Sequence, residues 1–163
     1  MAAGDIILDL EGVEGESKDS TYSGKIEIET YSWGLSNSAA GHAGGGAGVG
    51  RAAFSDLNLT AYTSKASTTL FINCAIGKHA NKATLYVRKV GGDDKPKMYM
   101  KYTLTEPYIT SFQHSHGAGA SLAMESFALN FSKFEFEYFI QDEKGVTKSA
   151  GDQTFDIKAN KKG

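Results

Sequence analysis

Regular alternation of apolar and polar residues constrains the fold of this chain more than any other feature of its sequence. In residues 97–105, KMYMKYTLT, methionine, tyrosine and leucine occupy the even positions, and lysine, tyrosine and threonine occupy the odd ones. In residues 133–140, KFEFEYFI, large apolar side chains again alternate with lysine and glutamate. A period of two is the spacing of side chains on one face of a β-strand. Both stretches are therefore predicted to be half-buried strands.

The phase of this alternation changes at two points in the sequence. Apolar residues stand at odd positions in 127–131 and at even positions from 134 onward, which predicts a bulge or a turn near Ser132. In the same way, the even-numbered isoleucines of 26–28 are followed by odd-numbered apolar residues in 31–35. Further strands are predicted at 6–10, 53–61, 83–90 and 154–157. So many short strands predict a mainly β chain, folded as a small antiparallel β-barrel or β-sandwich.

One segment, residues 64–79 (SKASTTLFINCAIGKH), has helical rather than alternating periodicity. The positions of one helical face are occupied by Ser67, Leu70, Phe71 and Cys74. Ser64 or Ser67 can cap the beginning of such a helix, and Gly77 stands where a left-handed residue ends one. One flanking α-helix is therefore predicted at about residues 65–76, with Cys74 buried on its apolar face.

The composition fits a single domain over residues 1–163 and excludes some functions. The formal net charge is −2 without a long basic block, so nucleic acid is not an expected partner. Cys74 is the single cysteine, which excludes an intrachain disulfide and suits a reducing cytoplasm. The opening residues, MAAGDIILDLEG, lack the basic start of a secretory signal, and no stretch has the length of a membrane-spanning helix. We therefore expect no membrane insertion.

A tract with six glycines between Gly41 and Gly50 is the obvious candidate for a phosphate-binding loop. The stretch GGAGVGRA places two glycines at the spacing of such a loop. However, Arg51 stands where the loop needs lysine, and Ala52 stands where it needs a hydroxyl for Mg²⁺. The tract is therefore predicted to be a mobile loop or an interface loop.

The remaining candidates for chemistry give no catalytic or metal site. His114 and His116 are one residue apart, but no CxxC or HExxH partner accompanies them, so two solvated imidazoles in an exposed loop are expected. Cys74 and His79 do not form a convincing thiol–imidazole pair, because Cys74 lies on the apolar face of the predicted helix and His79 lies beyond its end. The chain is predicted not to be an enzyme, and no cofactor or metal is expected.

Apolar residues near several strand ends occupy both faces, which leaves two interpretations. Tyr31, Trp33 and Leu35 follow the isoleucines of 26–28, and Phe139 stands beside Phe134. A core covers one face of a strand, so the surplus indicates a protein interface. Alternatively, bulges return both sets of side chains to one core. The sequence leaves both interpretations open.

Six motifs occur in a specific order along the chain. They are GESKD at 15–19, YSWG at 31–34, the glycine tract, CAIGKH at 74–79, RKVGG at 88–92 and ESFALNF at 125–131. Over about residues 15–138 this set resembles the Hcp (haemolysin-coregulated protein) family, the tube protein of the bacterial type VI secretion system. The resemblance implies a tail-tube-like β-barrel with a flanking helix that forms homohexameric rings. It further implies that the rings stack into a hollow tube, that the protein leaves the bacterial cytoplasm through the system, and that small effector proteins travel in the lumen.

The resemblance also assigns roles to particular residues. Alternation within YSWG predicts that Trp33 points to a core or a subunit contact, and that Ser32 and Gly34 point the opposite way. With the resemblance, Ser32 and Gly34 are expected to face the lumen and contact effectors. Ring stacking is expected to involve Gly44, Gly45, Gly46, Gly48, Gly50 and Arg51. Subunit contacts are expected at strand ends and at the turn Gly91–Asp94. The expected partners are further copies of the chain, the type VI sheath, spike and baseplate proteins, and effectors.

A second function class remains compatible with the residues alone. A monomeric β-sandwich module that binds carbohydrate would use Trp33 and tyrosines as stacking platforms. The native mass distinguishes the two classes, because the tube protein predicts about six copies and the binding module predicts one.

Overall fold

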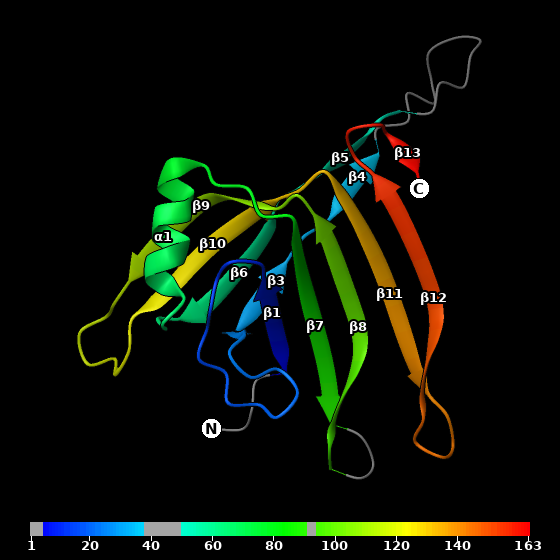
Figure 1. Cartoon of the computed structure of the whole chain (residues 1–163), viewed down its shortest axis with the longest axis horizontal. Helices are drawn as coiled ribbons and strands as arrows, with labels where there is room; N and C mark the ends of the chain where they lie inside the picture. Colours follow the sequence, from blue (N-terminus) through cyan, green and yellow to red (C-terminus); the bar gives the residue numbers. More distant parts are fainter. Residues whose placement is uncertain (1–4, 38–49, 91–93) are drawn as a thin grey trace.

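The structure is a computed structural model that describes residues 5–37, 50–90 and 94–163. It is built from antiparallel strands and one helix (Figure 1). In chain order the elements are β1 (Ile6–Leu10), β2 (Ile26–Ile28), β3 (Thr30–Ser32), β4 (Leu35–Asn37), β5 (Ala52–Phe54), β6 (Leu57–Tyr62), α1 (Ser67–Ile76), β7 (Lys82–Val90), β8 (Pro96–Thr105), β9 (Tyr108–Ser115), β10 (Met124–Asn130), β11 (Lys133–Gln141), β12 (Thr147–Asp156) and β13 (Lys161–Lys162).

Two unequal sheets form an open sandwich. The larger sheet has seven strands in the order β13-β12-β11-β8-β7-β1-β2, and the smaller has four in the order β3-β6-β10-β9. Strands β4 and β5 form a separate two-stranded ribbon. Helix α1 lies beside β9 at one flank of the molecule, and β11 and β12 form the opposite flank (Figure 1). The prediction of a mainly β, sandwich-like fold with one flanking helix is confirmed.

Both predicted phase changes are points at which the chain passes from one sheet to the other. Between β2 and β3 the chain leaves the seven-stranded sheet for the four-stranded one, and between β10 and β11 it returns. The core lies between the two sheets, so each sheet turns a different side toward it. When the chain crosses from one sheet to the other, the side of the strand that faces the core reverses, and the apolar residues change from even to odd positions or back. A turn around Ser132, rather than a bulge within one strand, explains the second phase change.

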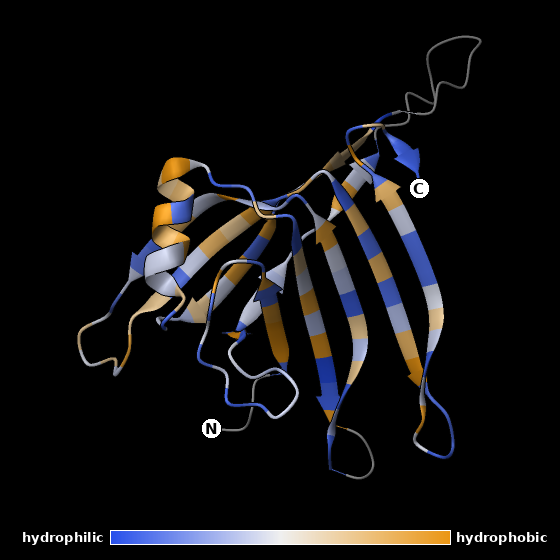
Figure 2. Cartoon of the chain, in the orientation of Figure 1, coloured by the Kyte–Doolittle hydropathy of each residue, from blue (hydrophilic) through white to orange (hydrophobic). Residues whose placement is uncertain are grey.

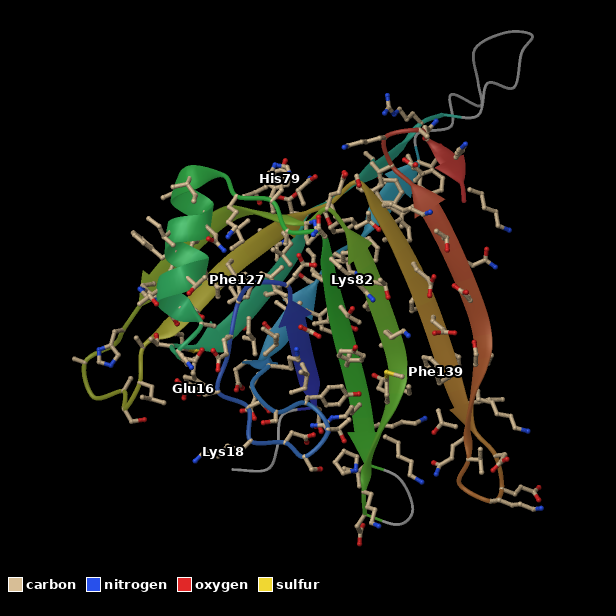
Figure 3. All side chains as sticks on the ribbon, in the orientation of Figure 1. Glu16, Lys18, His79, Lys82, Phe127 and Phe139 are labelled. Atoms are coloured by element: carbon tan, nitrogen blue, oxygen red, sulfur yellow. The ribbon has the colours of Figure 1, made fainter. Side chains whose placement is uncertain are left out.

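The core lies between the two sheets and is closed at one flank by the helix. The buried apolar residues include Leu8, Ile26, Leu57, Leu59, Leu70, Leu85, Leu104, Phe127 and Leu129. Hydrophobic and hydrophilic positions alternate along the long strands (Figure 2). Figure 3 shows Phe127 in the interior and Phe139 on the flank that carries β11.

Three sequence-based boundaries differ from the structure. The single strand predicted at 53–61 is two strands, β5 and β6, in different sheets. Between them, the Asp56 carboxylate accepts hydrogen bonds from Thr110 Oγ1 at 2.6 Å and Asn130 Nδ2 at 2.9 Å, which hold the bend. The strand predicted at 154–157 is the end of β12, which begins at Thr147. Leu35 lies exposed in β4, which pairs only with β5 in the described chain, so the interpretation that places it in the core is not supported.

Helix α1 begins and ends close to the predicted positions, but its capping differs. Ala66 is the N-cap residue and makes no side-chain capping bond, whereas the predicted caps bond just before the helix: Ser67 Oγ accepts from the Ser64 amide at 2.9 Å. Gly77 ends the helix with φ of 64°, a left-handed conformation that glycine adopts without steric cost. Cys74 packs against the core, as the prediction of an apolar face requires, but it is half buried rather than buried.

The connection between β1 and β2 folds closely onto the larger sheet. The amide of buried Gly15 donates to the Gly24 carbonyl oxygen at 2.8 Å. An ion pair of 2.8 Å between Arg88 Nη1 and Asp19 Oδ2 fixes this connection to β7, and the two side chains are only 5% and 10% exposed. Tyr22 lies under the Arg88 guanidinium, 5.2 Å from Cζ to the ring centroid, and packs on Tyr86.

Candidate assembly surfaces

Trp33 follows β3 and packs on three aromatic side chains of the core. Its ring lies edge-to-face with Tyr102, Phe131 and Phe134, at centroid distances of 5.4, 5.6 and 5.0 Å. Aromatic pairs prefer this arrangement, and each contributes about 0.5–1.5 kcal/mol beyond the area that it buries. The structure therefore places the half-buried indole of Trp33 against the core.

Ser32 and Gly34 lie on the outer side of the same segment, as the alternation in YSWG requires. Both residues are exposed, and Ser32 in β3 is paired with Asn58 in β6. Gly34 joins the segment to Ser55, because its amide donates to Ser55 Oγ at 2.9 Å and its carbonyl oxygen accepts from the Ser55 amide at 2.9 Å. The segment therefore exposes only a small side chain, that of Ser32, on the opposite side from Trp33.

Most of the predicted stacking loop lies outside the described residues. This applies to Gly44, Gly45, Gly46 and Gly48, and also to residues 91–93 of the predicted subunit-contact turn. Gly50 is half buried and Arg51 is exposed, immediately before β5. Arg51 borders a hollow of about 130 Å³ that Phe54 and Ile157 also line. The described end of the tract therefore carries an exposed cation next to apolar side chains.

The core side of the larger sheet continues beyond the area that the smaller sheet covers. In β11, Phe134 contacts Trp33, and the even-numbered residues that follow point to the same side. Phe136 stacks on Tyr102 at 4.8 Å between ring centroids, while Tyr138 and Ile140 extend outward. The three are 37–49% exposed, and we call them the distal apolar face. Phe139, the surplus apolar residue expected in this strand, lies on the other face, where it is half buried and Lys101 Nζ is 5.9 Å from its ring centroid.

Helix α1 also presents apolar side chains outward. Leu70 is fully buried, whereas Phe71, Ile72 and Ile76 are 50–66% exposed. Phe71 is at the margin of the core, because its ring lies 5.8 Å from that of Phe112 in β9. The prediction that Phe71 belongs to the buried face was therefore wrong. We call the three exposed residues the helix patch.

His114 and Glu125 form a pair that the sequence did not predict. His114 lies in β9 rather than in a loop, directly opposite Glu125 of β10, while His116 follows the strand and is exposed. The Glu125 side chain is fully buried, with Oε2 at 3.2 Å from His114 Nε2 and no partner for Oε1 among the described residues. One feature of the sequence could have indicated this pair. In ESFALNF, Glu125 stands two positions before the buried Phe127 and therefore points to the same inward face of the strand.

Removing His114 should destabilise the chain, because it leaves the buried Glu125 carboxylate without a described partner. We expect His114→Ala to lower the free energy of unfolding by about 2–3 kcal/mol, since a buried polar group that loses its hydrogen-bond partner is costly. The double variant with Glu125→Met should recover part of this loss, because it removes the buried polar group itself. Urea unfolding measures both, and His116→Ala is the matched control with an expected change within about 0.5 kcal/mol. Equal losses in the two histidine variants would contradict the prediction.

The described ranges contain neither a group of metal ligands nor a membrane-spanning helix. In residues 5–37, 50–90 and 94–163, no three His, Cys, Asp or Glu side chains are grouped so that they could hold a metal ion. The same ranges contain no helix that is both long and apolar enough to cross a membrane.

Comparisons with known proteins identify the family. A sequence model of the family described as "Type VI secretion system effector, Hcp" matches residues 7–138. The protein hcp1 of Pseudomonas aeruginosa is 35% identical over 142 residues, which cover 87% of each chain. A solved structure of a type six secretion system protein covers 99% of this chain and 100% of its own, with a TM-score of 0.88 and 26% identity. The crystal structure of Hcp1 from Salmonella typhimurium covers 97% of both chains, with a TM-score of 0.78 and 32% identity. This chain therefore belongs to the Hcp family of type VI secretion system proteins.

Proposed function

We propose that this chain is the subunit of a type VI secretion tube and assembles as homohexameric rings that stack. The observation that carries the proposal is the distal apolar face, where the core side of the larger sheet has no cover within the described chain. Seven strands face only four, so one copy cannot bury the whole inner surface of its larger sheet. A partner that completes the core stabilises the chain, and membership of the Hcp family supports further copies as that partner.

The backbone of β12 supports the same conclusion. β12 pairs with β11 along its length, but in the described chain only Phe155 and Asp156 pair with β13 on the other side. Within the described residues, no strand pairs with this edge of β12 before Thr154, whose carbonyl oxygen accepts from the Gly163 amide at 2.9 Å. Monomeric proteins usually protect such edges from pairing with other chains.

Native mass spectrometry followed by negative-stain imaging tests the proposal. We expect a mass of about six copies and ring-shaped particles, whereas a strict monomer at high protein concentration would contradict self-assembly. The alternative, a carbohydrate-binding module, is weakened by the packing of Trp33, because a ring held by Tyr102, Phe131 and Phe134 is not a free stacking platform.

Ser32 and Gly34 are proposed to line the lumen, and Ser32→Gln tests this placement. Ser32 is exposed and lies on the opposite side of the segment from Trp33, so a larger side chain should leave the core intact. We expect the variant to form rings of unchanged native mass and to lose co-purifying effector proteins. Ser20→Gln, the same change at an exposed position of the β1–β2 connection, is the control that should retain effectors. Loss of ring formation in Ser32→Gln would contradict the lumenal placement.

The glycine tract, with Arg51, is proposed to contact the next ring. Glycine-rich backbone can change conformation at an adjoining ring, provided that contacts offset the entropy of ordering. Deletion of residues 44–48 is therefore expected to leave single rings intact and to shorten tubes in electron micrographs. Tubes of unchanged length, or rings that no longer form, would contradict a role limited to stacking.

The wider assembly follows from the same proposal. A tube subunit requires a contractile sheath around it and spike and baseplate proteins at its end, and its lumen carries small effectors. On this proposal the chain acts as a structural protein rather than an enzyme. It leaves the bacterial cytoplasm through the system that it helps to build.

A further inference from the structure

We propose that Asp56 sets the direction in which the β4–β5 ribbon leaves the body of the molecule, which consists of the two larger sheets and α1. The glycine tract lies between β4 and β5 in the sequence, so the ribbon carries both of its ends. The inference rests on the proposed stacking role of the tract. It assigns a positioning role to a residue outside the tract, because a ribbon of fixed direction presents the tract to the next ring.

Hydrogen bonds join the two strands of the ribbon where they leave the body. The Gly34 amide donates to Ser55 Oγ, and the Ser55 amide donates to the Gly34 carbonyl oxygen, both at 2.9 Å. Gly34 directly precedes β4, and Ser55 directly follows β5. A group that fixes the chain next to Ser55 therefore fixes the direction of both strands.

Asp56, the next residue, is held by two further strands of the smaller sheet. Its Oδ2 accepts from Thr110 Oγ1 of β9 at 2.6 Å, and its Oδ1 accepts from Asn130 Nδ2 of β10 at 2.9 Å. In the strand order β3-β6-β10-β9, the half-buried side chain thus connects the start of β6 with both β10 and β9. Both oxygens of one carboxylate are occupied, each by a different strand.

Aromatic contacts hold the base of the ribbon to the larger sheet. Phe54 packs on Phe134 of β11 and on Phe155 of β12, at 5.6 and 5.4 Å between ring centroids. Accordingly, the ribbon leaves the body close to the end of β12 (Figure 1). The hydrophobic effect is not directional, whereas a hydrogen bond weakens steeply as its angle departs from linear. Phe54 therefore attaches the base of the ribbon, and Asp56 determines its angle.

The chemistry at Thr110 provides a conservative variant that keeps both hydrogen bonds. Thr110 Oγ1 also lies 3.3 Å from the Ala128 carbonyl oxygen, to which it can donate instead. A hydroxyl group can donate and accept at the same time. In Asp56→Asn the side-chain amide can therefore donate to Thr110 Oγ1, while its oxygen still accepts from Asn130. In Asp56→Ala neither hydrogen bond remains.

Distances between spin labels in the assembled full chain measure the direction of the ribbon. In a Cys74→Ser background, Ser36→Cys marks the ribbon and Ser126→Cys marks the smaller sheet, both at exposed positions. Labelled chains are diluted with unlabelled ones, so that a ring holds at most one labelled pair. We expect one narrow distance distribution for the parent and for Asp56→Asn, and a broadened or shifted one for Asp56→Ala. Asp5→Ala, the same change at an exposed aspartate before β1, should keep the narrow distribution.

Ring stacking is measured in parallel on chains without labels. If the released ribbon has the stacking direction about one-tenth of the time, the protein concentration at which half of the rings are stacked rises about tenfold. We expect a rise of this size for Asp56→Ala and none for Asp56→Asn or Asp5→Ala. The native mass of single rings should be the same for all three, which shows that each variant folds and assembles.

The outcomes distinguish the inference from the proposed function. An unchanged distance distribution in Asp56→Ala would overturn the inference, and so would equal losses of stacking in Asp56→Asn and Asp56→Ala. A displaced ribbon with unchanged stacking would also overturn it, because the direction of the ribbon would then not matter for assembly. These three results leave the proposed rings intact. A parent chain that stays monomeric, or whose rings never stack, would overturn the inference together with the proposed function.

Discussion

Gly15→Ala is expected to lower the free energy of unfolding by about 3 kcal/mol, at the upper end of the usual cost of overpacking. A Cβ at this position would lie 2.6 Å from the Lys25 carbonyl carbon and 2.9 Å from the Ile26 amide nitrogen. Both atoms belong to backbone that cannot yield easily, because Ser17 donates to the Lys25 carbonyl oxygen at 3.0 Å and Gly24 donates to Ser17 at 2.8 Å. Side-chain adjustment therefore cannot relieve the clash.

Urea unfolding at one fixed protein concentration measures this effect, since assembly makes apparent stability depend on concentration. Gly117→Ala is the matched control: it lies in an exposed loop, and an added Cβ would meet nothing within 4 Å. Its expected change is within about 0.5 kcal/mol. Similar unfolding midpoints for the two variants would show that the β1–β2 connection relaxes freely around position 15.

Asp19→Asn is expected to destabilise the chain by about 3 kcal/mol at neutral pH, because it removes the carboxylate that forms an ion pair with the buried Arg88 guanidinium. The pair measures 2.8 Å, and both side chains are at least nine-tenths buried. The ion pair between Lys25 and Asp9 has a similar length, 2.9 Å, but both side chains are more than one-third exposed. Asp9→Asn is therefore the control, with an expected loss below about 1 kcal/mol.

The effect of Asp19→Asn should disappear in acid. The hydrogen bond from Arg88 is the main cause that lowers the pKa of the Asp19 carboxyl from its ordinary value of 3.8, against the opposing effect of burial. A carboxyl group whose pKa is lowered by folding stabilises the folded chain at pH values above its ordinary pKa. This stabilisation is lost as the pH falls through the lower pKa of the folded state. Unfolding free energies of the parent and Asp19→Asn should therefore differ at pH 7 and converge below pH 3.8. A constant difference over this range would contradict the assignment of the effect to charge.

The sequence predicted the secondary structure well wherever the buried residues recur at the regular spacing of a strand or a helix. The alternation in 97–105 and 133–140 gave the long strands β8 and β11, and the helical spacing around Leu70 gave α1. The phase change at Ser132 marked a turn correctly, although the sequence did not reveal that the chain changes sheets there. The break at Ser55–Asp56 was missed, because the hydrogen-bond partners of Asp56 are 54 and 74 residues away.

The candidate site was predictable only in part. The alternation in YSWG placed Trp33 opposite Ser32 and Gly34, which is the arrangement in the structure. The pairing of His114 with Glu125 was not predicted, because it depends on the cross-strand register of β9 and β10. Register is a property of two strands together, and neither strand encodes it in its own period.

The sequence by itself determined which residues of each strand point inward, where the helix lies, and, through six ordered motifs, which family the chain belongs to. These features depend on side-chain period and on residue identity, both of which are local. Only the tertiary structure decided which inward-pointing residues are covered. Phe134 and Tyr138 have the same register in β11, yet Trp33 contacts the first and Tyr138 remains 41% exposed. The reason is that cover comes from the facing sheet, and its four strands do not reach across the seven that they face.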